Sequence, residues 1–152
     1  YRDLSRDLIF VSADARRHRA GIVASGGSMD NDWVLLRLRE PLPGPLPLAG
    51  PDGGKAGALV LAGLPKSAVR DSSLVLRTAC AVTGYDGTDL RSDCVLTRGA
   101  SGGAAVDVTG TPRYLGVISR GDGASQSIFV PVARFYEQLR LHLATAADPA
   151  AP

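Results

Sequence analysis

The sequence has 152 residues, 45% of them hydrophobic and 21% charged, and a formal net charge of +2. This length suits one domain, or one complete unit and part of another, and the composition is sufficient for a hydrophobic core. The 17 basic residues are scattered along the chain, which argues against a nucleic-acid-binding stripe. No apolar run approaches the roughly 18 residues of a membrane-spanning helix. We therefore expect no nucleic-acid partner, no membrane span and no cofactor, and we expect a monomer.

Short apolar runs, each too short for a typical helix, recur between clusters of Gly, Pro, Asp and Ser, and this pattern predicts an all-β sandwich or barrel. In chain order, the predicted strands cover residues 7–13, 18–25, 32–38, 58–64, 73–82, 93–97, 103–108, 114–119 and 127–132. One helix is predicted to begin near Pro131, which suits a first helical turn. Its apolar stripe consists of Val132, Phe135, Tyr136, Leu139 and Leu143.

Proline and glycine are dense in a segment that separates two groups of strands. We interpret this segment as a linker between two structural units. The predicted organisation is a first group of strands at 1–40, the linker at 41–54, a second group at 55–130, the helix at 131–146 and a disordered tail at 147–152.

The two cysteines, Cys80 and Cys94, lie in apolar strand-like runs that a turn-rich segment joins. They form either a disulfide or two reduced core thiols, and a hairpin that brought them close would favour the disulfide. Closing a loop of about 15 residues contributes roughly 3 kcal/mol through the entropy of the unfolded chain. A disulfide would also indicate an oxidising compartment. A zinc site that adds His18 and His142 lacks the usual ligand spacing, so no metal is expected.

Ser101 stands between Gly99-Ala100 and Gly102-Gly103 in an otherwise apolar run. So many small residues around one hydroxyl indicate a tight turn, a close approach of the backbone, or both. One interpretation is a glycine-rich hairpin turn. The other is a nucleophile whose neighbouring N–H groups face a substrate oxygen.

The same five residues also fit the Gly-x-Ser-x-Gly elbow of α/β-hydrolases, with His142 downstream and Asp107 or Asp122 between them. That fold requires a helix directly after the serine. The residues after Ser101 instead predict a strand, a turn and another strand. The elbow interpretation is therefore rejected.

Three segments, in chain order, resemble the chymotrypsin/trypsin-like serine proteases, and in particular their bacterial, glutamyl endopeptidase-like branch. Residues 31–38 (NDWVLLRL) resemble the strand with the triad aspartate, which falls on Asp32. Residues 94–103 (CVLTRGASGG) resemble the nucleophile loop, which places the nucleophile at Ser101. Residues 114–121 (YLGVISRG), followed by SIFVPV and a helix, resemble the strand along the substrate cleft and the end of the family's chain.

The resemblance implies two six-stranded antiparallel barrels, the first incomplete in this chain, with a C-terminal helix. It implies a secreted or periplasmic serine endopeptidase that cleaves a protein or peptide substrate through a His–Asp–Ser triad. The N–H groups of Gly99 and Ser101 would form the oxyanion hole, and the disulfide would be the family's bridge. The implied substrate pocket has its base, mouth and walls at Val95, Arg98, Ser119, Arg120 and Gly121. Because Val95 offers no carboxylate, we expect apolar or acidic side chains, not basic ones, before the scissile bond.

Two positions depart from the family's pattern. Ala100 stands where the family usually has the aspartate that receives the new N-terminus after zymogen cleavage, so we expect no such switch. The family's histidine motif is absent ahead of Asp32, because His18 lies in a basic run and is interpreted as a surface residue.

The chain opens on Tyr1 rather than on methionine, and its first eleven residues resemble the segment that follows the family's histidine. We therefore expect the histidine to lie a few residues before Tyr1, and we expect the chain alone to be inactive. The alternative is a catalytically inactive protease homologue that serves as a binding or interaction module.

Overall fold

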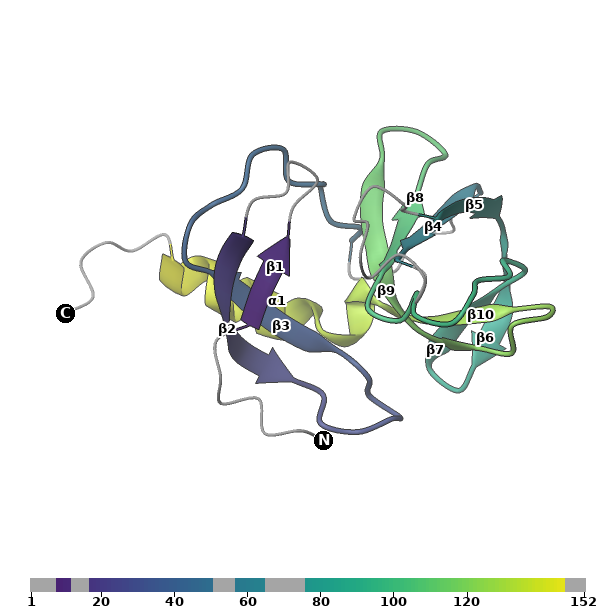
Figure 1. Cartoon of the computed structure of the whole chain (residues 1–152), viewed down its shortest axis with the longest axis horizontal. Helices are drawn as coiled ribbons and strands as arrows, with labels where there is room; N and C mark the ends of the chain where they lie inside the picture. Colours follow the sequence, from purple (N-terminus) through teal and green to yellow (C-terminus); the bar gives the residue numbers. More distant parts are fainter. Residues whose placement is uncertain (1–7, 12–16, 51–56, 65–75, 147–152) are drawn as a thin grey trace.

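The computed structural model describes residues 8–11, 17–50, 57–64 and 76–146. Its elements form two antiparallel sheets that lie side by side, with a helix that follows the second sheet and returns to the first (Figure 1). Within the described ranges, no helix is both long enough and apolar enough to cross a membrane. The predicted tail at 147–152 and part of the predicted linker, 51–54, lie outside these ranges.

The first sheet has the order β1–β2–β3 and consists of β1 (Leu8–Val11), β2 (Arg17–Ser25) and β3 (Val34–Leu38). The second has the order β5–β4–β8–β9–β10–β7–β6. Its strands are β4 (Leu59–Gly63), β5 (Leu76–Cys80), β6 (Val82–Asp86), β7 (Asp89–Ser92), β8 (Ala104–Asp107), β9 (Arg113–Gly121) and β10 (Ser127–Pro131). A 3₁₀ helix, η2 (Val132–Arg134), and the helix α1 (Tyr136–Ala146) complete the described chain.

The second sheet curls because its two edge strands, β5 and β6, follow each other with only Ala81 between them. At this corner the Ala81 N–H donates to the Asp93 carboxylate (2.7 Å), and the Asp93 N–H donates to the Ala81 carbonyl (3.2 Å). The predicted disulfide between Cys80 and Cys94 is confirmed next to these bonds, with the two Cα atoms 5.3 Å apart. Since each sulfur is bonded to the other, neither is available as a zinc ligand.

The interior of the curled sheet is a hydrophobic core. Leu59 and Leu61 project into it from alternate positions of β4, which shows the period of two that a strand with one buried face requires. The other fully or nearly fully buried members include Leu115, Ile118 and Phe129. The nucleophile-like loop also contributes, through Leu96 and Ala100.

A second, smaller core joins the two sheets. Trp33, directly before β3, packs on Phe135 of the helical segment with ring centroids 5.5 Å apart. Val130 of β10 and Val132 of η2 complete its buried part. The predicted helical stripe is therefore buried where it begins, whereas Leu143 near its end is 56% exposed.

One predicted turn is in fact a hairpin, and one predicted strand is absent. β6 and β7 pair through a two-residue turn at Gly87 and Thr88, inside the segment that was expected to connect two strands. Glycine at the first of the two turn positions is a usual signal for such a hairpin, and Gly87 has a φ of 62°. Residues 93–97 form no strand, and in this segment the Cys94 carbonyl accepts a hydrogen bond from the Ser127 hydroxyl (2.8 Å) instead of from the backbone of a neighbouring strand.

We predict that reduction of the disulfide lowers the free energy of unfolding by about 3 kcal/mol, because it releases a cross-link over a loop of about 15 residues. The measurement is urea unfolding of the chain with and without a thiol reductant. The paired Cys80→Ala/Cys94→Ala variant is the control, since the reductant should leave its stability unchanged. Two thiols that titrate in the folded, unreduced protein would contradict the prediction.

Candidate active site

Ser101 lies in the loop between β7 and β8, and the glycines around it have distinct conformational roles. Gly99 has a φ of 101° and Gly102 a φ of 84°, both in the left-handed region that other residues rarely adopt. The Gly102 N–H donates to the Ile118 carbonyl (2.8 Å), and the Ile118 N–H donates to the Gly103 carbonyl (2.9 Å). The loop is therefore fastened to β9 by the two residues directly after Ser101.

A second constraint on this loop is the space beneath it. A Cβ atom at Gly103 would lie 2.3 Å from the Ala62 carbonyl oxygen of β4, and one at Gly63 would lie 2.8 Å from the Ala100 Cβ. Ala100 itself is buried. The small residues on both sides of Ser101 therefore serve two needs, the positive φ angles and the close approach of loop and strand.

Ser119 in β9 connects Ser101 to Asp32. The Ser101 hydroxyl donates to the Ser119 carbonyl oxygen (2.8 Å), and the Ser119 hydroxyl donates to the Asp32 Oδ2 atom (2.6 Å). Asp32 comes from the loop before β3, so this contact links the first sheet to the second. Among the described residues, the other carboxylate oxygen of Asp32 accepts no hydrogen bond.

Most of the predicted site residues line one cavity of about 380 Å³. Of those named from the sequence, the lining includes Arg98, Gly99, Ser101, Ser119, Arg120 and Gly121. Val95, the predicted base, is not part of it: its side chain is 43% exposed, and the next residue, Leu96, is buried and lines the cavity instead. The base was predicted by counting six residues back from Ser101. The backbone of this segment is irregular, so that count does not determine which side chain points into the cavity.

The amide groups of the loop fall into two sets. The N–H groups of Ala100, Gly102 and Gly103 donate to backbone carbonyls. Within the described part of the chain, those of Gly99 and Ser101 have no acceptor. Two unbonded donors therefore flank Ala100 beside the cavity.

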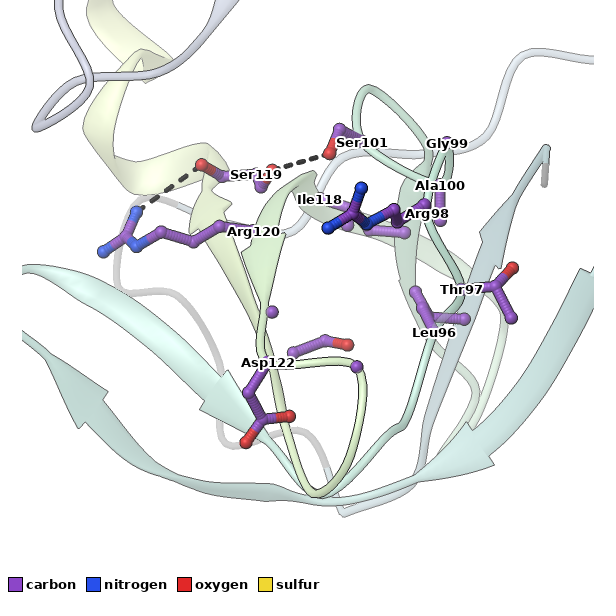
Figure 2. A pocket seen from close by; sticks show the side chains of 13 residues that line it. Leu96, Thr97, Arg98, Gly99, Ala100, Ser101, Ile118, Ser119, Arg120 and Asp122 are labelled. Carbon is purple, nitrogen blue, oxygen red and sulfur yellow. Dashed lines mark hydrogen bonds between the residues drawn. The ribbon is translucent and has the colours of Figure 1, made fainter. Parts of the chain in front are cut away.

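The two arginines of the cavity differ in their surroundings (Figure 2). Arg120 forms ion pairs with Asp86 (2.9 Å) and Asp89 (3.0 Å). Burial lowers the pKa of Arg120, but the hydrogen bonds to Asp86 and Asp89 outweigh this effect and raise it above the ordinary value. Arg98 has no hydrogen bond or ion pair among the described residues. In Figure 2 the Arg98 side chain extends toward β9, whereas the Arg120 guanidinium lies on the far side of Ser119 from Ser101 and approaches the Ser119 hydroxyl.

Asp122 lines the cavity as well and was not predicted. Its carboxylate accepts the Ser125 hydroxyl and the N–H groups of Ser125, Ala124 and Gln126. These bonds, the one to the Ser125 hydroxyl first, hold the pKa of Asp122 well below its usual range. The turn that it organises forms one rim of the cavity.

Neither histidine of the chain is among the described residues that line this cavity. His18 lines a separate one, together with Arg19, Arg39 and Glu40. His142 lies in α1, where its carbonyl accepts a hydrogen bond from Arg37 (3.0 Å).

The structure resembles known serine proteases over most of its length. The HtrA-type protease AlgW, in a structure with a decapeptide, aligns with 90% of this chain at a TM-score of 0.67 and 20% identity. The VesB protease of Vibrio cholerae aligns with 85% at a TM-score of 0.65 and 21% identity. A serine endoprotease of Yersinia pestis aligns with 91% of the chain at a TM-score of 0.65 and 19% identity. No protein-family model and no curated protein sequence matches the chain.

These alignments confirm the predicted fold class: the chain has the all-β, chymotrypsin-like fold with a C-terminal helix. The chain spans less than half the length of each of the three structures, with 44% of AlgW, 46% of VesB and 49% of the Yersinia enzyme covered. At these identities the likeness shows the fold alone, so any activity has to be argued from the site residues.

We predict that Gly103→Ala lowers the free energy of unfolding by about 1–3 kcal/mol, because its Cβ collides with the backbone of β4 and forces the loop to move. Gly21→Ala in β2 is the matched control, since a Cβ there meets nothing within 4 Å. It should change stability by no more than about 0.5 kcal/mol. Urea unfolding of both variants checks the prediction, and equal effects would contradict it.

Proposed function

We propose that this chain is part of a serine endopeptidase, in which Ser101 is the nucleophile and Asp32 is the carboxylate that orients a histidine. The observation that carries the proposal is the pair of hydrogen bonds through Ser119. They hold a hydroxyl and a carboxylate from different sheets on one residue of β9, beside a cavity. A glycine-rich turn with no catalytic role would not require a carboxylate from the other sheet at this place.

The chemistry of these groups suits acyl transfer. The Ser101 oxygen attacks the carbonyl carbon of a peptide bond while a histidine accepts its proton, and the Asp32 carboxylate stabilises the imidazolium that forms. The unbonded N–H groups of Gly99 and Ser101 would hold the oxyanion, and removal of one such donor typically costs about 10²–10³ in turnover. The carboxylate oxygen of Asp32 that accepts no bond within the described residues is available to an imidazole N–H.

The histidine is the missing member of this triad. Since neither described histidine lines the cavity, we propose that residues outside these 152 supply it. The decapeptide in the AlgW structure supports a peptide or protein substrate. The disulfide supports an oxidising compartment, and so a secreted or periplasmic protein.

The same absence favours a second candidate, an inactive homologue that binds peptides. The cavity, the two unbonded amides and Arg98 could hold a peptide without cleaving it. A peptide that binds the histidine-containing form of the protein but is recovered intact would support this candidate over the protease.

We predict that a fluorophosphonate probe labels Ser101 in a form of the protein that includes the residues before Tyr1, because the probe requires an activated serine. Mass spectrometry of the labelled peptide is the measurement, and Ser101→Ala is the control. The 152 residues alone should hydrolyse peptides only weakly, since loss of a triad member leaves only about 10³–10⁴ over the uncatalysed rate even in an intact site. Failure of the longer form to label, or robust hydrolysis by the 152 residues, would contradict the proposal.

Cleavage specificity follows from the charge of the cavity. Among the described residues, Arg98 is the cation of this cavity that forms no ion pair, whereas Arg120 is paired with two aspartates. The Asp122 carboxylate accepts hydrogen bonds from its own turn. A lysine or arginine side chain would enter without a free carboxylate partner, which is unfavourable.

We predict that the complete enzyme cleaves after apolar or acidic residues and discriminates against Lys and Arg. A peptide library profiled by mass spectrometry provides the measurement. Arg98→Gln should reduce cleavage after acidic residues and leave cleavage after apolar residues unchanged. A profile dominated by Lys or Arg before the scissile bond would overturn the assignment.

A further inference from the structure

Asp89 is a buried carboxylate at the start of β7, with 2% of its surface exposed. One oxygen pairs with Arg120 of β9 (3.0 Å) and the other with Arg134 of η2 (3.4 Å). A single buried acid therefore holds two arginines from two different elements. Taking a carboxylate out of water is costly unless it is paired, so the three side chains depend on one another.

Arg134 extends from this pair to the loop of the first sheet that carries Asp32. Its Nη2 atom donates to the Asn31 Oδ1 atom (3.0 Å) and to the Asp30 carbonyl oxygen (3.1 Å). The Trp33 indole N–H donates to the same Asn31 oxygen (2.8 Å). The residues on both sides of Asp32 are therefore bound, directly or through Asn31, to one guanidinium.

Arg120 connects Asp89 to Asp32 by a second route, through Ser119. It follows Ser119 in β9, and its Nη1 atom, which pairs with Asp89, also lies 3.5 Å from the Ser119 hydroxyl oxygen (Figure 2). That hydroxyl is the donor to Asp32. Asp89 thus orients both the group that bonds the Asp32 carboxylate and the group that fastens the loop around it.

We infer that Asp89 is a positioning residue: through Arg134 and Arg120 it fixes the place of Asp32 relative to Ser101. Asp89 does not line the cavity and touches no group that would react. Its catalytic consequence rests on the proposed function, whereas its effect on the Asp32 loop does not. The ion pair between Asp89 and Arg134 connects the second sheet to the loop of the first sheet that carries Asp32.

The chain offers a spectroscopic probe for this role, because Trp33 is its one tryptophan. Trp33 is adjacent to Asp32 and only 8% exposed. We expect Asp89→Asn to shift the Trp33 emission to longer wavelength and to increase its quenching by acrylamide, because a neutral amide holds the two arginines less firmly and the loop loosens. Both quantities are measured on the 152-residue chain in buffer, after circular dichroism has shown that it is folded.

Asp107→Asn is the matched control. Asp107 is a buried carboxylate of the same sheet and pairs with Arg113 (2.8 Å), with no bond to the Asp32 loop. A hydrogen bond from the Thr109 N–H, opposed by burial and assisted by Arg113, holds the pKa of Asp107 below its usual value. The control variant therefore removes an equivalent charge and ion pair, but it should leave Trp33 emission and quenching unchanged.

Arg134→Met tests the same connection with less risk to folding. Methionine removes the guanidinium but keeps an unbranched apolar chain at this partly exposed position. It should change Trp33 in the same direction as Asp89→Asn, and the double variant should change it by less than the sum of the two, as expected for groups that act together. If Asp89→Asn does not fold, Arg134→Met alone decides. Unchanged Trp33 emission and quenching in the folded variants, or an equal change in Asp107→Asn, would overturn the inference.

Kinetics on the histidine-containing form separate this inference from the proposed function. Asp89→Asn should lower kcat by about 10-fold to 100-fold at nearly constant KM, because a displacement of about 1 Å in a catalytic group can cost about 10²-fold. Asp107→Asn should leave both constants unchanged. A response of Trp33 without any labelling of Ser101 would support the loop contact and reject the protease. Labelling together with an unaltered kcat in Asp89→Asn would reject the positioning role alone.

Discussion

Ser119 is the residue on which the arrangement of the site depends. Its carbonyl accepts the Ser101 hydroxyl and its own hydroxyl donates to Asp32, so one residue of β9 holds a group from each sheet. Neither sheet contains both groups. The site therefore exists only as long as the sheets keep their relative position, and much of the remaining structure contributes to that.

Two features maintain this position, and a third, the disulfide, holds the second sheet itself. The small core around Trp33 and Phe135 packs the first sheet against the helical segment. The ion pairs of Asp89 connect Arg134, and through it the Asp32 loop, to the second sheet. The disulfide ties the corner at Cys80 to the start of the segment that leads to Ser101. The first two features are coupled, because Arg134 and the Trp33 indole donate to the same Asn31 oxygen.

The loop around Ser101 shows how backbone geometry selects residue types. Positive φ angles at Gly99 and Gly102 and the close approach of Gly103 to β4 each exclude a side chain for a separate reason. The same geometry leaves two amides of the loop without acceptors in the described structure while the others are bonded. Unbonded donors beside a hydroxyl suit the binding of a substrate oxygen. The glycines and the proposed chemistry therefore depend on the same backbone geometry.

The sequence by itself determined the features that depend on short stretches of neighbouring residues. Alternating apolar runs indicated the all-β fold, and the motifs around Asp32 and Ser101 indicated the protease-like fold. For the two cysteines the sequence left a disulfide and two reduced thiols open, and the predicted hairpin favoured the disulfide that the structure contains. The β6–β7 hairpin could have been predicted from the Gly87-Thr88 turn, but the apolar runs on either side dominated the interpretation.

Only the tertiary structure decided the features that join residues far apart in the chain. Asp89 and Arg134 are separated by 45 positions, and no local pattern distinguishes them from ordinary surface charges. Leu96 lines the cavity where Val95 was predicted to do so. The backbone is irregular there, so the alternation typical of a strand does not predict which side chain points inward. Local sequence encodes strands, turns and short motifs, whereas the packing of two sheets against each other sets which charges are buried and which side chains face the cavity.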